Sequence, residues 1–402
     1  MSKEKRRVPK LRFPEFTEDW EQRKLGEFVK IVSGDAPSTF ISGNCIYVKV
    51  DDLNYSDRIQ LSSSNLVNAN PKAHLVNQGA TIFPKRGAAI MTNKVRIMGK
   101  DGYLDTNMMA LIPEEIDKDF LFTFIQKTGL YKIADTSTIP QINNKHIEPY
   151  MIQVPSEKEQ AYIGVVFKQI DKIITLHQRK LDNLKLKKKA LLQKLFPKNG
   201  ERYPELRFPG FTDAWEQRKL GDIATFSKGN GYSKSDLASS GDPIILYGRL
   251  YTNYETTISN IDTFVELKDK SVISQGGEVI VPASGETAED ISRASVVKKQ
   301  GIIIGGDLNI IKANHLLDPT FLALTISNGE QQKELSKRAQ GKSVVHLHNS
   351  DLQEVNLTFP VLDEQKEIST LFKKMDNIIT LHQRKLDHLQ LQKKALLQQM
   401  FV

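Results

Sequence analysis

Two short groups of residues in this 402-residue chain have types that catalysis uses. Gly341-Lys342-Ser343 ends like a phosphate-binding loop, but the glycine that such a loop requires five residues before Gly341 is replaced by Ser336. His346-x-His348 has the spacing of two residues on one face of a strand. The eight histidines do not cluster with the spacing of metal ligands, so neither group predicts an active site.

A third group, Glu364-x-Lys366, superficially resembles part of a nuclease motif. The equivalent position in an internal repeat described below reads Glu159-x-Ala161, and no convincing acidic residue precedes either copy. We expect Glu364 to act at a helix start that follows Pro360. With no nucleophile paired to a base, the sequence favours a binding protein over an enzyme.

Clusters of polar residues suit contacts to nucleic acid better than catalysis. Arg and Lys bind guanine or phosphate, and Asn pairs with adenine. In the first half of the chain the candidates for DNA contact are Lys49, Lys85, Arg86, Thr92, Asn93, Lys94, Arg96, Gln141, Asn143, Asn144 and Lys145. In the second half they are Tyr247, Arg249, Tyr251, Thr252, Tyr254, Ser284, Glu286, Thr287, Lys342, Ser343, His346 and His348. Ordinary surface polarity explains any single member equally well, so only the clusters carry weight.

Short β-rich stretches and connecting loops must position these clusters. Apolar runs bounded by turn residues predict strands at 45–50 and 79–84 and a short helix at 119–127. The second half predicts strands at 243–247 and 278–282 and a matching helix at 319–328. The clusters fall in the glycine- and asparagine-rich connections, where residues that bind ligands usually lie.

The chain contains an internal repeat. LRFPEFTEDWEQRKLGE at 11–27 recurs as LRFPGFTDAWEQRKLGD at 206–222, an offset of 195 residues. DKIITLHQRKLD at 171–182 recurs as DNIITLHQRKLD at 376–387, an offset of 205. The segments between these blocks hardly resemble each other. We therefore expect a duplicated scaffold, with an internal pseudo-twofold, that carries two divergent globular domains.

Each unit ends in a helix with an unbroken 4-3-4-3 apolar seam, which is typical of a coiled coil. The seam positions are Ile163, Phe167, Ile170, Ile174, His177, Leu181, Leu184, Lys188, Leu191 and Leu195, then Ile368, Phe372, Met375, Ile379, His382, Leu386, Leu389, Lys393, Leu396 and Met400. If the helices pair with each other they can be antiparallel, with one domain at each end. A seam of some 33 residues is about 50 Å long, against about 34 Å for one turn of DNA.

Polar residues interrupt both seams at the same two steps, His177 with His382 and Lys188 with Lys393. Such residues either fix register or partner choice, or sit at a wet edge and extend into solvent, and the sequence weighs these alternatives evenly. For the run Lys185, Lys187, Lys188 and Lys189, a solvated helix face is favoured over contact with phosphates or an acidic partner.

Composition agrees with a polyanionic partner. The formal net charge is +8, 39% of the residues are hydrophobic, and the single cysteine, Cys45, excludes an internal disulfide. The polar start and the lack of a run of about 18 apolar residues predict a cytoplasmic protein with no membrane span.

The paired L-R-F-P-x-F-x-x-x-W-E-x-R-K-L-G blocks and the heptad helices with KKALLQ near their ends resemble Type I restriction–modification specificity subunits. YGRLYTNY, GKSVVHL and AAIMTNKVRI are similar to segments of that family's target-recognition domains. The resemblance implies an α+β chain with target-recognition domains at 8–156 and 201–362. It also implies conserved helices at 157–197 and 363–402 that form an antiparallel two-helix coiled coil.

The resemblance further implies that each domain reads one part of a split site in double-stranded DNA. Two modification subunits with S-adenosylmethionine would methylate adenine, and two restriction subunits would use ATP and Mg, while this chain binds no cofactor or metal. The sets Phe13/Phe16/Trp20 and Phe208/Phe211/Trp215 either pack each domain onto its helix, which we favour, or anchor the modification subunits. A lone endonuclease and a protein-binding coiled-coil adaptor are the two rival interpretations.

Overall fold

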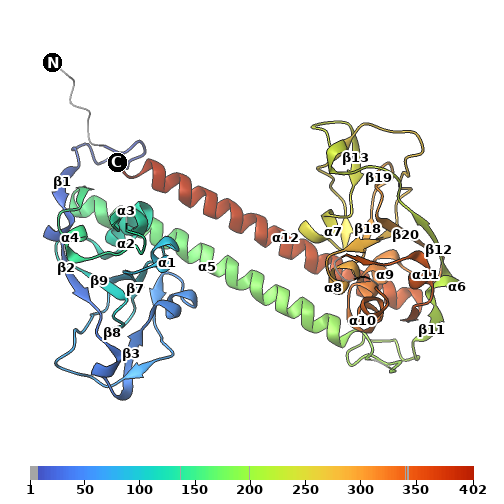
Figure 1. Cartoon of the computed structure of the whole chain (residues 1–402), viewed down its shortest axis with the longest axis horizontal. Coiled ribbons are helices and arrows are strands. Elements are labelled where there is room, and N and C mark those ends of the chain that lie inside the picture. Colours follow the sequence, from blue (N-terminus) through green and yellow to red (C-terminus); the bar gives the residue numbers. More distant parts are fainter. Residues whose placement is uncertain (1–7, 136, 199, 340, 342–343) are drawn as a thin grey trace. The chain divides into compact units, whose positions relative to one another are not determined.

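The computed structural model describes residues 8–135, 137–198, 200–339, 341 and 344–402. The chain divides into two compact units, the first made of residues up to 179 together with 384–402, the second of residues 180–383 (Figure 1). Each unit holds one globular domain and part of both long helices. We call residues 21–154 head 1 and residues 216–359 head 2.

Head 1 is built on a five-stranded sheet of order β2-β9-β6-β7-β4, a three-stranded sheet of order β5-β3-β8 and the pair β1-β10. The bounds are β1 Glu21–Lys24, β2 Val29–Ser33, β3 Ser42–Val48, β4 Ile59–Gln60, β5 Leu66–Val67, β6 Thr81–Pro84, β7 Arg96–Met98, β8 Gly102–Leu104, β9 Met108–Pro113 and β10 Met151–Val154. Its helices are α1 Ala88–Met91, α2 Lys118–Thr128, α3 Leu130–Ile133 and α4 Asn144–Ile147.

Head 2 repeats this topology with sheets of order β12-β20-β16-β18-β14 and β15-β13-β19, and the pairs β11-β22 and β17-β21. The strands are β11 Glu216–Lys219, β12 Ala224–Lys228, β13 Asp242–Ile245, β14 Thr257–Ile258, β15 Phe264–Val265, β16 Glu278–Pro282, β17 Ser284–Gly285, β18 Ser295–Val297, β19 Ile303–Ile304, β20 Leu308–Ala313, β21 Val345–His346 and β22 Asn356–Phe359. The helices are α6 Leu220–Ile223, α7 Arg249–Thr252, α8 Ala288–Ile291, α9 Pro319–Ile326, α10 Gly329–Arg338 and α11 Asn349–Gln353.

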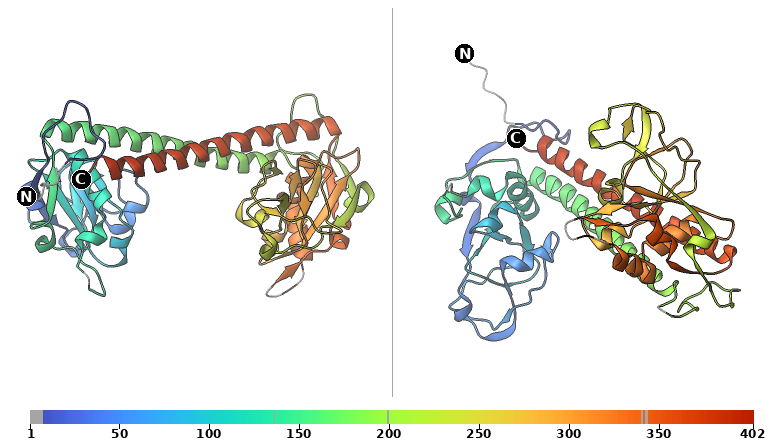
Figure 2. Two further views of the ribbon diagram at one scale, coloured as in Figure 1. Left: turned by 90° about the horizontal axis from the view of Figure 1, so that it is seen from above. Right: turned by 45° about the vertical axis from the view of Figure 1, so that its right-hand side comes forward.

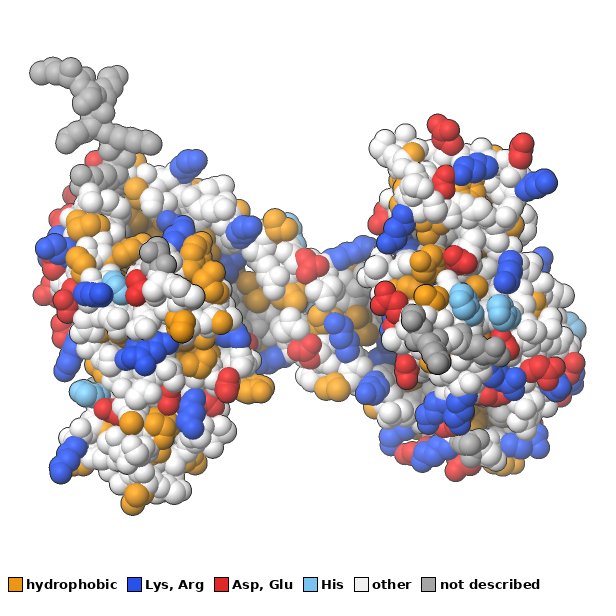
Figure 3. Space-filling view, viewed as in Figure 1, with side chains coloured by type: hydrophobic (Ala, Val, Ile, Leu, Met, Phe, Trp, Pro, Cys, Tyr) orange, Lys and Arg blue, Asp and Glu red, His pale blue; other side chains and the backbone are white. Residues whose placement is uncertain are grey.

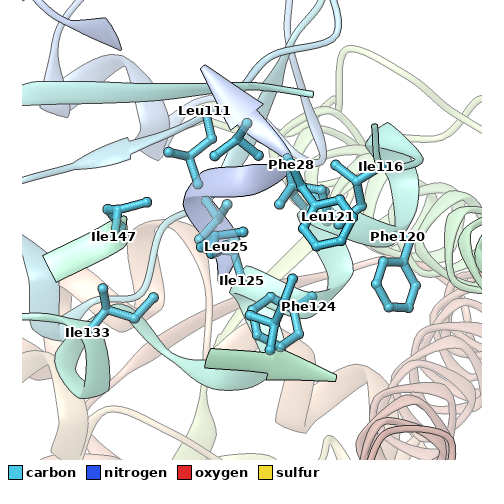
Figure 4. Packing of buried hydrophobic residues seen from close by; sticks show 14 of the residues in the cluster. Leu25, Phe28, Leu111, Ile116, Phe120, Leu121, Phe124, Ile125, Ile133 and Ile147 are labelled. Atoms are coloured by element: carbon cyan, nitrogen blue, oxygen red, sulfur yellow. The ribbon is translucent and has the colours of Figure 1, made fainter. Parts of the chain in front are cut away.

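The central strands and one capped helix account for the core of each head. Every residue of β6 and β16 is buried, as expected for strands covered on both faces. The Asp117 carboxylate caps α2 by accepting from the backbone N–H of Asp119 and Phe120 at 2.9 and 2.8 Å, and Asp318 caps α9 through Phe321 at 2.9 Å. Figure 4 shows Phe120, Leu121, Phe124 and Ile125 of α2 packed beside Leu25, Phe28 and Leu111.

The long helices α5 (Glu157–Lys194) and α12 (Leu362–Gln399) pack together and run along one side of each head (Figure 2). In the first unit the start of α5, with Ile163 and Phe167, shares a core with Leu396 of the last turns of α12 and with Met400 just after it. In the second unit the start of α12, with Phe372, shares a core with Leu191 of the last turns of α5 and with Leu195 just after it. The two helices are therefore antiparallel within each unit, which confirms the predicted packing of two mixed α/β domains with long helices.

Two predictions of local structure need correction. His346 lies in β21, but His348 is the N-cap residue of α11, so the two histidines do not belong to one strand. The helix α10 was not predicted, because nearly all of its residues are polar or charged and only Leu335 is fully buried. The strands predicted at 79–84 and 278–282 and the helices at 119–127 and 319–328 are confirmed to within a few residues.

Candidate DNA interface

The segments that follow the central strands bring the predicted clusters together. After β6, Arg86 pairs as an isolated bridge with Gln141, and the N–H of Ile142 donates to the Lys85 carbonyl at 2.9 Å. After β16, β17 pairs with β21, which sets Ser284 opposite His346. We call residues 85–92 with 139–145 the β6 edge, and residues 247–252, 284–287 and 344–348 the β16 edge. The segments after β6 and β16 occupy the same place in the repeated topology, and the β16 edge also includes residues 247–252, which follow β13.

The β6 edge offers cationic, amide and apolar side chains to solvent. Arg86, Thr92, Asn144 and Lys145 are exposed, while Gln141 and Asn143 are half-buried. Two apolar side chains also protrude, Met91 at 63% and Ile139 at 64% exposure. Lys85 is buried, and that burial lowers the pKa of its ammonium group. The edge therefore combines hydrogen-bonding groups for base edges with apolar groups that suit a thymine methyl.

Four predicted contact residues of head 1 have internal partners instead. Asn93, in the left-handed region with φ 48°, donates to the Gln126 carbonyl and accepts from the Leu130 N–H, both at 2.9 Å. The Arg96 guanidinium donates to the carbonyl oxygens of Leu53 and Ser56 at 2.7 and 2.9 Å. Lys94 bonds to the side chain of Asn54, and the Lys49 ammonium lies 5.8 Å from the ring centroid of Tyr47. The hydrogen bonds of Asn93 and Arg96 stabilise the fold of head 1.

The β16 edge is richer in aromatic rings. A pocket of about 410 Å³ lies there, with Tyr247, Tyr251, Ser284 and Glu286 in its lining. Tyr247 and Tyr251 meet edge to face at 6.1 Å, and the rings of His346 and His348 stack with centroids 6.4 Å apart. Tyr251 donates to the Ser284 carbonyl at 2.7 Å, and burial raises the pKa of its hydroxyl, so it stays protonated.

The remaining candidates of head 2 divide into three groups. Thr252, Glu286 and Thr287 are exposed on the β16 edge. Arg249 is committed to ion pairs with Glu255 and Asp262 at 2.9 and 2.7 Å, and Tyr254 donates to the Ala294 carbonyl at 3.2 Å. Lys342 and Ser343 lie outside the described residues.

The family of the chain follows from its similarity to known proteins. The model of the Type I restriction modification DNA specificity domain matches the chain twice, at residues 17–186 and 212–391. The chain belongs to this family. It is the DNA specificity subunit of a Type I restriction–modification system and, as such, the non-catalytic component of that enzyme.

Related proteins and solved structures are similar to this chain over nearly its whole length. The specificity subunit of the Type I restriction enzyme MjaVIII of Methanocaldococcus jannaschii is 22% identical, over 96% of this chain and 92% of that protein. The crystal structure of the Type I S subunit from M. genitalium has a TM-score of 0.68 at 13% identity, covering 98% and 99% of the two chains. A chain from a study of complex assembly and conformational transition of the type I R-M system has a TM-score of 0.51 at 16% identity, covering 95% and 97%. These structures share the fold of this specificity subunit.

The blocks that repeat in this specificity subunit build the junction between head and helix. Arg12 binds Glu159, and Arg207 binds Glu364, through two parallel hydrogen bonds of 2.8 Å in each case. Both glutamates are 1% exposed, and hydrogen bonding to Glu159 raises the pKa of Arg12. Glu364 lies in the first turn of α12, as expected for a helix-start role, and its structural partner is Arg207. The sequence did not reveal the arginine partner, because LRFP and the glutamate lie about 150 residues apart.

The repeated tryptophans also lie at the junction between head and helix. Trp20 and Trp215 are 2% and 0% exposed and belong to the cores that join head and helix, so the favoured packing interpretation is confirmed for them. Phe13 and Phe16 are half-buried and meet the ring of Tyr162 at 5.4 and 5.6 Å. Phe208 also packs against the second core.

On the face drawn in Figure 3, Lys and Arg are intermixed with Asp and Glu over both units. Within the described ranges, no group of three or more His, Cys, Asp or Glu is placed to hold a metal ion. In the same part of the chain, every helix is too short or too polar to cross a membrane.

Proposed function

We propose that head 1 and head 2 each read one half of an interrupted, asymmetric site in double-stranded DNA. The observation that carries this proposal is the difference between two equivalent edges on one repeated fold. Arg86 beside Gln141 on the β6 edge corresponds to Ser284 beside His346 on the β16 edge. Because the donor and acceptor patterns differ, the two half-sites should differ as well.

The proposed contact set is narrower than the sequence suggested. It keeps Arg86, Thr92, Gln141, Asn143, Asn144 and Lys145 of the β6 edge, and Tyr247, Thr252, Ser284, Glu286, Thr287, His346 and His348 of the β16 edge. We propose domain bounds of 8–156 and 201–362 for the two readers, with conserved helices at 157–197 and 363–402. The antiparallel seam would set the unread gap between the half-sites.

The subunit would direct chemistry that its partners perform. We propose two modification subunits, which carry S-adenosylmethionine and methylate adenine, and two restriction subunits, which use ATP and Mg. The chain would act inside the cell, where its DNA target lies. The long helices leave many off-seam residues exposed, among them Ile173, Leu176 and Leu381, which gives such partners apolar surface to bind.

A head exchange tests the proposal. Residues 9–154 are replaced by the equivalent segment of a divergent specificity subunit, and a host lacking adenine methylation expresses the chimera with the cognate modification subunit. Methylome sequencing should show one altered half-site, with the other half-site and the gap unchanged. The reciprocal exchange of head 2 should alter the other half. A change in both halves after either exchange would contradict the two-reader model.

A further inference from the structure

Two aspartates of the long helices each hold a lysine of the opposite helix. In the first unit, the Lys393 ammonium lies 2.7 Å from Asp171 Oδ1. In the second unit, the Lys188 ammonium lies 2.5 Å from Asp376 Oδ1. Asp171 and Asp376 are equivalent in the repeat, as are Lys188 and Lys393, so one contact is built twice. The side chains are 12% to 29% exposed, and the lysines therefore do not simply extend into solvent.

These ion pairs form in one register only. A slip of one heptad would put Lys188 opposite Gln383 or Ser369 instead of Asp376. The same slip would put Lys393 opposite Gln178 or Gly164 instead of Asp171. A half-buried ammonium group without its carboxylate is costly, whereas an apolar seam tolerates a heptad slip. Both pairs therefore favour the observed register.

The second oxygen of each aspartate binds the head of its own unit. Asp171 Oδ2 accepts from Arg58 Nη1 at 2.5 Å, and Asp376 Oδ2 accepts from the Thr256 hydroxyl at 3.0 Å. Arg58 and Thr256 are structural equivalents, since each precedes the edge strand β4 or β14. Each also accepts a backbone hydrogen bond of 2.9 Å, from Ile97 and Val296.

We propose that Asp171 and Asp376 are positioning residues that couple the register of the helices to the seat of each head. One carboxylate oxygen fixes the opposite helix and the other fixes the recognition domain. Because this role rests on the proposed reading of two half-sites, the two aspartates would determine which gap between half-sites the complex accepts.

The two copies of this contact differ in charge. Arg58 adds a charge to the first copy, binds Asp119 Oδ1 at 2.8 Å and lies 4.2 Å from the ring centroid of Phe122. Thr256 adds no charge to the second copy. Exchanging lysine and aspartate in the second unit therefore recreates an ion pair, with the Thr256 hydroxyl able to accept from the new lysine. The same exchange in the first unit places a lysine beside Arg58.

Thermal unfolding of the purified subunit tests the coupling without DNA. Lys188→Asp and Asp376→Lys should each lower the Tm by at least about 5 °C, and their combination should restore more than half of that loss. Asp171→Lys with Lys393→Asp should stay destabilised relative to the unaltered subunit. Made in the Arg58→Thr variant, which has already lost the contacts of Arg58 with Asp119 and Phe122, the same exchange should lower the Tm less relative to that variant. Lys374→Asp, an exposed reversal on α12, is the matched control. Reversals no worse than this control, or equal rescue in both units without Arg58→Thr, would overturn the proposal.

Methylation of a library with gaps of varied length tests the positioning role. Single reversals with the modification subunit should lower methylation at the native gap at least tenfold relative to neighbouring gaps, and the second-unit exchange should restore the native preference. If a reversal fails to fold, Asp376→Asn removes the charge but keeps an acceptor for Thr256, and should broaden the accepted gaps. An unchanged gap preference despite coupled Tm values would overturn the positioning role. No methylation at any gap by the unaltered complex would instead overturn the proposed function, while the Tm series still decides the register.

Discussion

Arg12 and Glu159 join the start of the described chain to the first turn of α5 by two hydrogen bonds of 2.8 Å. Arg207 and Glu364 make the same pair in the second unit. A bidentate pair fixes both distance and angle, and it holds here with a carboxylate that is almost fully removed from water. The repeated blocks of the sequence thus secure heads to helices, while the segments between them, which differ between the two halves of the chain, form the heads.

Removing the arginine should destabilise the first unit. Arg12→Ala leaves the Glu159 carboxylate buried without its partner, so we expect a loss of roughly 2–4 kcal/mol in the free energy of unfolding. Urea denaturation of the purified subunit measures this loss. Arg23→Ala, which removes an exposed pair with Glu27, is the control and should change stability little. Equal effects of the two substitutions would show that the Arg12 pair is not structural.

The residues that follow α12 should matter as much as the core of head 1. Phe401 is 6% exposed, stacks on Phe120 at 5.5 Å and meets Trp20 at 6.1 Å. Phe401→Ala should therefore cost about 3–5 kcal/mol of unfolding free energy. Leu391→Ala, at a position 67% exposed on α12, should cost far less and serves as the control. A stable Phe401→Ala protein would mean that the last residues are not packed as described.

Arg86 should act on one half-site. We expect Arg86→Ala to weaken binding of the assembled complex by roughly 10- to 100-fold and to relax a base preference in the half read by head 1. Lys158→Ala, an exposed cation at the start of α5, is the charge-matched control. Competition binding against single-base variants of the site measures both effects. Loss of affinity without any change in base preference, together with a smaller salt dependence, would assign Arg86 to phosphate instead.

The length of the paired helices should set the gap. Inserting seven residues at equivalent positions of α5 and α12 keeps the seam in phase and adds about 10 Å, close to three base pairs of DNA. The accepted gap should lengthen accordingly in a methylation assay over varied gaps. The same insertion in α5 alone should abolish methylation, because the two helices no longer match. An unchanged gap after the double insertion would refute the spacing role of the helices.

Much of the architecture could be predicted because it is periodic. The duplicated blocks and the 4-3-4-3 seam are regularities of the sequence itself, and β6 and β16 are apolar runs of strand length. The partners of individual side chains could not be predicted from the sequence in the same way. Arg96, Asn93 and Tyr254 are polar residues near loops, and only the folded chain shows that carbonyl groups inside the heads engage them. Asp171 lies one residue off the seam, so the heptad pattern gave no reason to pair it with Lys393.

We propose that one chain reads two different half-sites for its partners. Methylome sequencing of a host without adenine methylation, carrying this subunit and its cognate modification subunit, is the decisive experiment. We expect one interrupted, asymmetric motif with methyl-adenine in both halves. A modification subunit shown to be bound and active that yields no motif, or a motif with two identical halves, would contradict it.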